Sequence, residues 1–581
     1  MMSISASRFS RKYRPGSRSL GALLLLGLAG LLAACGSGSS SSSVSAKVAP
    51  TLSSIAVTAT PASVSAGSTS QFNAVGKYSD GTSGTITTSV TWTSATTTVA
   101  TIAASGLATG VAAGTSVITA TSGSITGTAT LTVTAAKTLT SVAISPSPAS
   151  VIAGSTTQLT AVATFSDGSI SALTTGVTWT STAAAAVVTV GATTGLATGV
   201  AVGTSSVTVT YSGMTSPLDT LTVTPAEFAF VTNFGENTVS QFRVGPGGSL
   251  VANGSPVGTG VQPFALAPDP TGKYLYVGNF NSDTLGTVSE YGIGTNGQLT
   301  ALATPNIPAG QGANGMTVYN NNVYVANIGD STITQYSINA TTGQLTTVAT
   351  TSSGTSTAGA ASITFYTNSA GTFAYVPNYK VGTISVFSVN ATSGLLSITA
   401  TSTATIPTGS TGPVSLAIDL SGKYAYVADL GSSSNTGDIA QFSINADGSL
   451  TALAPPTAVS GGNPRWITVD PKTGTLYVPN AGANSVQTFT VGTGGQLTAS
   501  AAATLASVTN PNYLAFDPTS TLLYVADRGG TFNGQTGPFD NTISQFSVST
   551  TSGLAPLAPP TVTTGATSAS EPTTIAFTLA N

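Results

Sequence analysis

The chain has 581 residues, of which 6% are charged, and it contains one cysteine and no histidine. A charged fraction this far below the usual quarter of a chain leaves Ser, Thr, Asn and Gly to cover most of the surface. The single cysteine excludes an intramolecular disulfide, and the missing histidine removes the commonest neutral-pH base and a common transition-metal ligand.

The first segment is typical of a bacterial export signal. Basic residues precede an apolar run over residues 20–34 that is too short to span a membrane comfortably. The sequence Leu-Ala-Ala-Cys-Gly around Cys35 resembles a lipobox, which implies lipidation of Cys35 and, without a following Asp, the outer membrane or cell surface. A plain transmembrane anchor is the alternative. We expect a lipoprotein signal peptide over 1–34 and a lipidated Cys with a Ser-rich tether over 35–50.

Two similar segments follow. A Thr-Trp-Thr triplet at residues 91–93 recurs 87 residues later, and Gly-Leu-Ala-Thr-Gly-Val occurs at 106–111 and again at 195–200. Short Val-, Thr- and Ile-rich strands between Gly, Ser and Asp turns, with one core Trp each, predict two β-sandwiches. These residues resemble the bacterial group 2 immunoglobulin-like domain, which implies a spacer or adhesion module. We assign Ig-like domains to residues 51–136 and 137–225.

From residue 226 onward an aromatic-Val pair recurs, followed two residues later by Asn or Asp. Successive aromatics lie 46 to 51 residues apart, which is the period of a four-stranded propeller blade. An apolar strand precedes each pair except the first, and two further strands follow it. The seven units are marked by Phe230, Tyr276, Tyr324, Tyr375, Tyr426, Tyr477 and Tyr524.

The two ends of this repeat array complement each other. The first unit lacks an inner strand, whereas residues 572–577 match the inner strand at 511–516 position by position. A ring closed in this way has no exposed strand edges. We therefore predict an all-β protein, with two Ig-like sandwiches followed by a seven-bladed β-propeller over 226–581 that a C-terminal inner strand closes.

Charge restricts the partners of the propeller. From Glu227 onward there are 7 basic and 15 acidic residues, a net charge of −8. Nucleic acid binding requires a basic groove, so no nucleic acid partner is expected, and an anionic membrane surface is disfavoured for the same reason. The expected contact with a membrane is the N-terminal lipid.

Strand order places the loop after each aromatic-Val strand and the start of each inner strand on one face. Asn and Asp are common turn residues, so we interpret those of the loops as turn closers, and likewise Asp269, Asp470 and Asp517 on the opposite face. The loop residues are Asn233, Asn279, Asn327, Asn378, Asp429, Asn480 and Asp527. The inner strands contribute Phe264, Asn314, Val414, Arg465, Trp466, Asn512, Tyr513 and Thr573.

One corner of this face concentrates charged and aromatic residues. Arg465 stands where the other blades have a neutral residue, and Arg is a good clamp for an anion or carboxylate. An ion pair with a neighbouring carboxylate such as Asp527 is the alternative. The ligand-binding candidates are Arg465, Trp466, Asn480, Asn512, Tyr513, Asp527 and Arg528.

The Tyr-Val-Ala/Pro-Asn/Asp repeat over about residues 227–581 resembles seven-bladed lactonase propellers, which include 6-phosphogluconolactonase, and equally the YVTN repeat of microbial surface-layer proteins. The resemblance is specific for the fold and weak for the activity. Lactone hydrolysis needs a group that activates water and one that holds an oxyanion. By position alone, Asp527 is the candidate base, and Arg465 or Arg528 the oxyanion partner.

No cofactor or metal is expected. A calcium site from the oxygens of Asp429, Asp438, Asp527 and Asp540 is conceivable, but no compact calcium loop supports it. Two functions remain open. The favoured one is a lipid-anchored cell-surface binding or scaffold protein whose propeller recognises a glycan, peptide or protein. The alternative is an exported lactonase-type hydrolase acting on a sugar lactone.

Overall fold

The computed structural model describes residues 49–182, 186–282, 284–407, 412–431, 437–500, 508–532, 535–549, 553–565 and 570–580. The chain divides into two compact units between Lys137 and Thr138. Among the described residues the helical elements are two short 3₁₀ turns, η1 (Pro246–Gly248) and η2 (Ala481–Ala483), and the rest of the regular structure is strand. This confirms the predicted all-β class.

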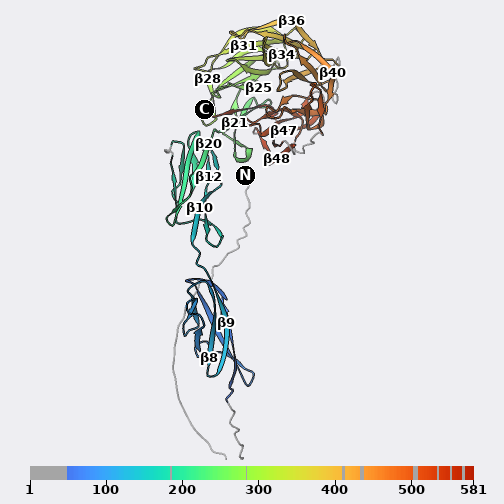
Figure 1. Ribbon diagram of the computed structural model, residues 1–581. Coiled ribbons are helices and arrows are strands. Elements are labelled where there is room, and N and C mark those ends of the chain that lie inside the picture. The colour runs from blue at the N-terminus through green and yellow to red at the C-terminus, as the bar shows by residue number, and fades with distance from the viewer. Residues whose placement is uncertain are drawn as a thin grey trace, which may run out of the picture. The chain divides into compact units, whose positions relative to one another are not determined.

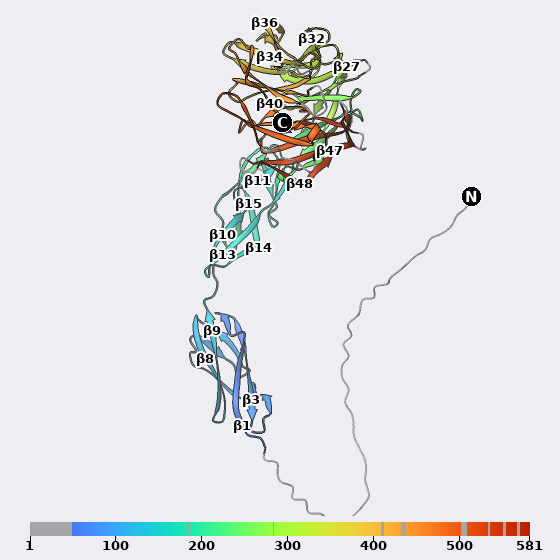
Figure 2. The same ribbon diagram turned by 90° about the vertical axis from the view of Figure 1, so that its right-hand side faces the viewer.

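The first unit is a β-sandwich. Its strands are β1 (Leu52–Thr60), β2 (Ser63–Ser65), β3 (Thr69–Tyr78), β4 (Ser83–Thr85), β5 (Thr91–Ser94), β6 (Ala100–Ile102), β7 (Leu107–Gly110), β8 (Gly114–Ser122) and β9 (Ile125–Thr134). They form sheets of order β1-β3-β7-β6, with β4 beside β3, and β2-β9-β8-β5. Figure 2 shows this domain with β1, β3, β8 and β9 labelled. Alternate side chains face the core, where the rings of Phe72 and Trp92 meet edge to face at 6.2 Å.

The second Ig-like domain repeats this plan. Its strands are β10 (Leu139–Ser145), β11 (Ala149–Ile152), β12 (Thr156–Gln158), β13 (Thr160–Phe165), β14 (Ile170–Leu173), β15 (Val177–Ser181), β16 (Val188–Val190), β17 (Leu196–Gly199), β18 (Gly203–Tyr211), β19 (Met214–Thr215) and β20 (Asp219–Thr224). The sheet β11-β20-β18-β15 packs with the shorter β10-β13-β14 and β12-β17-β16 sheets around the buried Trp179. The predicted core role of both repeated tryptophans is confirmed.

Residues from Glu227 onward form seven sheets that follow one another around a ring (Figure 1), as predicted. Blades 2 to 4 consist of β25 (Pro263–Pro268), β26 (Tyr274–Asn279), β27 (Leu285–Ile293) and β28 (Leu299–Gln311); β29 (Ala313–Tyr319), β30 (Asn322–Asn327), β31 (Thr332–Ile338) and β32 (Leu345–Ser352); β33 (Thr364–Asn368), β34 (Gly371–Asn378), β35 (Thr383–Val389) and β36 (Leu396–Thr405). In each blade the chain runs from the inner strand outward, and every pairing is antiparallel.

The remaining complete blades have the same order. Blades 5 to 7 consist of β37 (Pro413–Ile418), β38 (Tyr424–Asp429), β39 (Asp438–Ile444) and β40 (Leu450–Val459); β41 (Thr468–Val469), β42 (Leu476–Asn480), β43 (Ser485–Val491) and β44 (Leu497–Ala499); β45 (Pro511–Phe516), β46 (Leu522–Phe532), β47 (Gln535–Ser549) and β48 (Gly553–Thr563). The second strand of each blade is almost wholly buried, because neighbouring blades cover both of its faces.

Blade 1 is closed by the C-terminal end of the chain. Its strands β21 (Glu227–Asn233), β22 (Thr238–Val244), β23 (Leu250–Ala252) and β24 (Val257–Gly258) receive β49 (Pro572–Leu579) as the inner strand. Strand β49 pairs antiparallel with β21 and places Ile575 opposite Val231, both fully buried. The predicted closure is therefore confirmed, and it joins the first blade to the last.

Tyrosines of the repeat clamp each blade to the next one. The hydroxyl of Tyr426 donates to the carbonyl oxygen of Gly495 at 2.7 Å. A Cβ atom on Gly495, which has a φ of 81°, would lie 2.3 Å from the ring of Tyr424, so the clamp requires glycine there. The same contact joins Tyr276 to Gly343, Tyr324 to Gly394, Tyr375 to Gly448 and Tyr524 to Gly248.

A side-chain amide in the third strand forms a second inter-blade tie. Gln241 accepts from the amide of Leu299 in blade 2 at 2.6 Å and donates to Ser255 in its own blade at 2.7 Å. Gln441 and Gln545 make the equivalent pairs of bonds. Blade 2 has Glu290 at this position; it is 1% exposed and accepts from Leu345 at 3.3 Å. Burial raises the pKa of Glu290 to about 7.

The second Ig-like domain and the propeller share a contact within the second unit. Arg243 of β22 donates from Nη2 to the carbonyl oxygen of Ala153 at 3.1 Å and also hydrogen-bonds Ser155, just after β11. Ile152 packs against the hydrophobic cluster of blades 1 and 2. The contact combines a charge-assisted hydrogen bond with a small apolar patch.

Candidate functional site

The predicted face of the propeller carries a cavity of about 400 Å³. The loops after the second strands and the starts of the inner strands meet there because these strands pair antiparallel, with Asn279 opposite Pro263 and Asp527 opposite Pro511. Inner strands contribute Phe264, Asn314, Met316, Val414, Arg465, Trp466, Asn512, Tyr513 and Thr574 to the lining. The positions after second strands contribute Phe234, Phe280, Ile328, Tyr379, Lys380, Leu430 and Arg528.

Positive charge is concentrated in this cavity. Arg465 begins the inner part of blade 6, Arg528 lies in the second strand of blade 7 directly after Asp527, and Lys380 follows the second strand of blade 4. They are three of the seven basic residues in a propeller of net charge −8. No acidic residue is among the described residues that line the cavity. The cavity is thus cationic although the domain around it is acidic.

The two arginines lie close enough to affect each other. Both are buried, at 7% and 6% exposure. Burial, with repulsion from Arg528, lowers the pKa of Arg465 to about 9, while Tyr379 opposes the shift. Burial also lowers the pKa of Arg528, against the effect of Glu571, whose carboxylate lies 3.2 Å from Nη2. With a pKa of about 9, the guanidinium of Arg465 remains charged at neutral pH.

Aromatic rings form two walls of the cavity. The first wall is a triad of Phe234, Phe264 and Phe280, whose centroids lie 6.2 to 6.3 Å apart. The second wall is the pair Trp466 and Tyr513, at 4.4 Å. The guanidinium of Arg528 lies 4.8 Å from the centroid of Phe234 and 5.9 Å from that of Phe264, within cation–π range.

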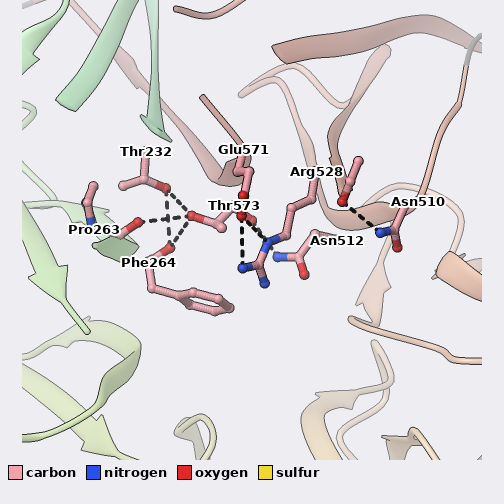
Figure 3. A network of polar contacts seen from close by, with 9 residues as sticks. Thr232, Pro263, Phe264, Asn510, Asn512, Arg528, Glu571 and Thr573 are labelled. Carbon is pink, nitrogen blue, oxygen red and sulfur yellow. Dashed lines mark hydrogen bonds and ion pairs between the residues drawn. The ribbon is translucent and has the colours of Figure 1, made fainter. Parts of the chain in front are cut away.

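Polar side chains beside the cavity are engaged in joining neighbouring inner strands (Figure 3). Asn512 donates to the carbonyl oxygen of Thr573 at 2.8 Å. The hydroxyl of Thr573 lies 2.8 Å from that of Thr232 and donates to the carbonyl oxygen of Phe264 at 3.1 Å, so the closing strand is tied to blades 1 and 2. Asn314 likewise donates to Ala361 at 2.8 Å, on the next inner strand. The amide donors are therefore part of the frame of the cavity.

The structure brings together five of the seven ligand-binding candidates. Arg465, Trp466, Asn512, Tyr513 and Arg528 line the cavity. The other two, Asn480 and Asp527, are fully buried and do not line it. A carboxylate oxygen of Asp527 accepts from the Ser544 hydroxyl at 2.6 Å. The ion pair between Arg465 and Asp527 stays a prediction.

The interpretation of the Asn and Asp ring as turn closers is wrong for the asparagines of blades 1 to 4. Their amide nitrogens bind hydroxyls on the following strand, as Asn279 binds Thr287 and Ser289 at 2.9 Å each. Full burial beneath a loop makes such side-chain partners necessary. Asp429 does close a turn, accepting from Gly431 at 3.0 Å. Turn closure is also observed for the opposite-face residues Asp269, Asp470 and Asp517.

Sequence reasoning missed one class of cavity residues. Phe234, Phe280, Ile328, Tyr379 and Leu430 each come directly after the Asn or Asp of a repeat. The signal was present, since this position carries large apolar or aromatic residues in a loop where the repeat predicts a polar turn. Arg528 occupies the same repeat position in blade 7, so the repeat also predicts that Arg528 lines the cavity.

Other predictions concern metals, the membrane and the N-terminus. Among the described side chains no three His, Cys, Asp or Glu residues converge as metal ligands would. Asp429 faces Asp438 across a strand pair, away from Asp527 in blade 7, and the side chain of Asp540 lies outside the described part. Cys35 and the predicted signal peptide also lie outside the described residues. No helix long and apolar enough to cross a bilayer occurs within the described ranges.

Comparison with protein families agrees with this architecture. Residues 203–503 match the family described as lactonase, 7-bladed beta-propeller. This is more than half of the chain, which therefore belongs to the lactonase seven-bladed β-propeller family. Residues 52–133 and 138–217 match the bacterial Ig-like domain (group 2). The resemblances to lactonase propellers and to bacterial group 2 Ig-like domains are thereby confirmed.

Solved structures resemble this chain at low sequence identity. The periplasmic gluconolactonase of Pseudomonas aeruginosa is 19% identical with a TM-score of 0.50, covering 62% of this chain and 100% of that one. A protein from Lactobacillus plantarum is 20% identical with a TM-score of 0.49, covering 61% of this chain and 100% of that one. At such identities the likeness concerns the fold alone.

A curated relative matches over a shorter stretch. Ice-binding protein 1 of Shewanella frigidimarina (strain NCIMB 400) is 36% identical over 131 residues, which amount to 22% of this chain. The chain spans only 15% of the length of that relative. The match therefore concerns a small part of both proteins.

Proposed function

We propose that the propeller binds a small organic anion in its cavity. The observation that carries the proposal is the convergence of Lys380, Arg465 and Arg528 on one cavity of an otherwise acidic domain. Like charges that share a mostly apolar site repel each other, and a carboxylate placed between them would relieve this repulsion. The sequence predicts a glycan, peptide or protein partner. A glycan or peptide would fit this site if it inserted a carboxylate-bearing terminal group small enough for the cavity.

Hydrolysis of a lactone is the second candidate, and membership of the lactonase family favours it. Water oxygen would bond to the acyl carbon, and the ring C–O bond would break. One water proton would then go to the ring oxygen, and the other would leave when the acid ionises. Arg465 and Arg528 are placed to stabilise the oxyanion of this step. Asp527 remains the proposed base, although its burial and its bond to Ser544 count against that role.

The location of the protein is a further part of the proposal. The lipobox-like sequence around Cys35 supports an envelope protein held to a membrane by an N-terminal lipid, with the two Ig-like domains as spacers. We expect labelled fatty acid to be incorporated into the full chain in a bacterial host and lost in Cys35→Ser. Incorporation that persists in Cys35→Ser would overturn the lipid anchor.

Binding and turnover can be tested on the same purified full chain. Gluconate and cinnamate are titrated by calorimetry, and gluconolactone and dihydrocoumarin are offered in a pH-stat. We expect binding of an organic anion, weakened roughly 100-fold in Arg465→Ala. The control is Leu420→Ala, an exposed residue of a loop between strands of blade 5 that does not line the cavity.

Each outcome decides between the candidates. Lack of binding by every anion, with the protein folded, would overturn the anion site. Lactone turnover that Arg465→Ala removes and Leu420→Ala retains would establish hydrolysis. Anion binding without turnover of either lactone would contradict the hydrolase function and support a binding function. Turnover lost in Asp527→Asn, with anion affinity retained, would support Asp527 as the base.

A further inference from the structure

We infer that the ligand of this cavity carries its carboxylate on a planar, apolar body, so that the cavity takes an aromatic carboxylate in preference to a sugar acid. The inference rests on the proposed anion site and names the class of molecule that fills it. Three features carry it: the two aromatic walls, the engagement of the polar side chains, and the position of the charges relative to the walls.

The walls offer flat aromatic surfaces from four consecutive blades of the ring. The triad of Phe234, Phe264 and Phe280 comes from blades 1 and 2, whereas Trp466 and Tyr513 come from blades 6 and 7. All five rings are partly exposed, in contrast to the fully buried repeat tyrosines such as Tyr426. Partly exposed rings in a concave site present faces on which another flat ring can stack.

The polar side chains do not suit a polyhydroxylated body. Asn314 and Asn512 donate their amides to neighbouring inner strands at 2.8 Å each, and the hydroxyl of Thr574 donates to the Phe264 carbonyl at 2.6 Å. Burial raises the pKa of Tyr513 to about 12, so its hydroxyl stays neutral. A sugar acid would bury several hydroxyls against Phe, Trp and Leu side chains, where unpaired polar groups are costly.

The two guanidinium groups belong to the same cavity as the walls. Arg528 stacks over Phe234 at 4.8 Å, and Arg465 directly precedes Trp466 in the same inner strand segment. A carboxylate between the two guanidinium groups would therefore leave its ring beside either wall. Glu571 holds Arg528 at 3.2 Å, so the bound carboxylate would share that guanidinium with a residue of the closing segment. A guanidinium fork can serve two carboxylates in this way.

Three matched probes test the inference on the full chain. Cinnamate has the charge and the flat body, cinnamamide has the body without the charge, and gluconate has the charge on a polyhydroxylated body. The chain has three tryptophans, and Trp92 and Trp179 lie in the Ig-like cores, so a change in fluorescence on binding that disappears in Trp466→Phe reports the cavity. Calorimetry provides the affinities independently.

We expect cinnamate to bind at least roughly tenfold more tightly than either gluconate or cinnamamide. Trp466→Leu should weaken cinnamate by roughly tenfold and change the affinity for gluconate by less than about twofold. Gluconate binding as tightly as cinnamate would overturn the inference and keep the anion site. Cinnamamide binding as tightly as cinnamate, with gluconate unbound, would overturn the anion site itself.

The test does not depend on one variant. Where Trp466→Leu lowers the thermal transition of the propeller, Phe280→Leu in the other wall replaces it, because that residue is also partly exposed. The same selective loss of cinnamate affinity is expected. Equal losses for cinnamate and gluconate in a folded wall variant would contradict stacking as the basis of selectivity.

Discussion

The seams between blades and the central cavity use the same repeat in opposite ways. At the seams one contact recurs, and the tyrosine hydroxyls of blades 2, 3, 4, 5 and 7 donate to a glycine carbonyl of the next blade. At the cavity one position carries a different residue in nearly every blade, such as Phe280, Ile328, Tyr379, Leu430 and Arg528.

The reason for the difference is the partner. A residue at the seam between two blades contacts a repeat residue of the neighbouring blade. The neighbouring blade therefore restricts which side chain fits there, and a substitution lowers the stability of the fold. A cavity residue meets solvent or a ligand, so the fold leaves it free to vary. Changes at the seams should therefore alter stability, and changes in the cavity should alter binding. Four predictions test this separation, from the largest expected effect to the smallest.

The largest effect should follow removal of the closing strand. Deletion of residues 571–580 removes β49, and with it the burial of Ile575 and the network around Thr573. The freed β21 would expose an unpaired strand edge. We expect the propeller to lose its cooperative unfolding transition while the Ig-like domains keep theirs, as measured by scanning calorimetry. A propeller transition within a few degrees of the original would contradict closure as the main lock.

Glu290→Gln tests a seam at which the glutamine of the repeat is replaced. The pKa of Glu290 is about 7 in the folded chain against 4.5 for an ordinary Glu, so the folded state binds more protons and loses stability as pH rises from 4.5 through 7. Gln cannot ionise and restores the donor used at Gln241. We expect Glu290→Gln to stabilise the propeller by about 1–2 kcal/mol at pH 8 and by much less at pH 4.

Urea unfolding followed by the fluorescence of Trp466, the one tryptophan of the propeller, measures this difference at each pH. Burial and Asp517 also raise the pKa of Glu227 to about 7, but that residue is present in both proteins and cancels in the comparison. A stability difference between the two proteins that does not change with pH would refute a protonated Glu290.

Tyr426→Phe removes one seam clamp and nothing else of the ring. The Gly495 carbonyl oxygen would lose a buried partner at 2.7 Å, which should cost about 1–2 kcal/mol. Tyr424→Phe is the matched control, because its hydroxyl lies 3.4 Å from the Thr493 carbonyl oxygen in an exposed position. The control should lose less than about 0.5 kcal/mol in the same urea titration. Equal losses would show that the clamp is not special.

The smallest effect compares the same change in both regions. Ile328→Val lies at the cavity and Ile333→Val in the buried cluster of blades 3 and 4, where the side chain is 1% exposed. We expect a loss of about 1 kcal/mol for Ile333→Val and less than about 0.5 kcal/mol for Ile328→Val. Urea titration of both variants checks this, and a larger loss at Ile328 would erase the distinction between seam and cavity.

Much of the candidate site could be predicted because the repeat assigns each residue to a strand position within a blade. Once the period is known, Arg465 falls just ahead of an inner strand and Arg528 directly after the Asp of a second strand, so both belong to one face. The partner of Arg528 could not be found in this way. Glu571 precedes the closing strand and comes from the far end of the chain, and it meets Arg528 only because blade 1 closes beside blade 7.

The chain's own order of residues determined the class of fold, the number of blades, the closing strand and the two sandwiches, because each depends on local periodicity and on patterns that recur. Only the closed ring determined which polar side chains are buried and which residues line the cavity. Asn480 and Asp527 look like surface turn residues in the sequence but are buried, whereas the aromatic residues after the turns face the cavity. Burial depends on what covers a residue, and in a propeller the cover comes from segments distant in the chain.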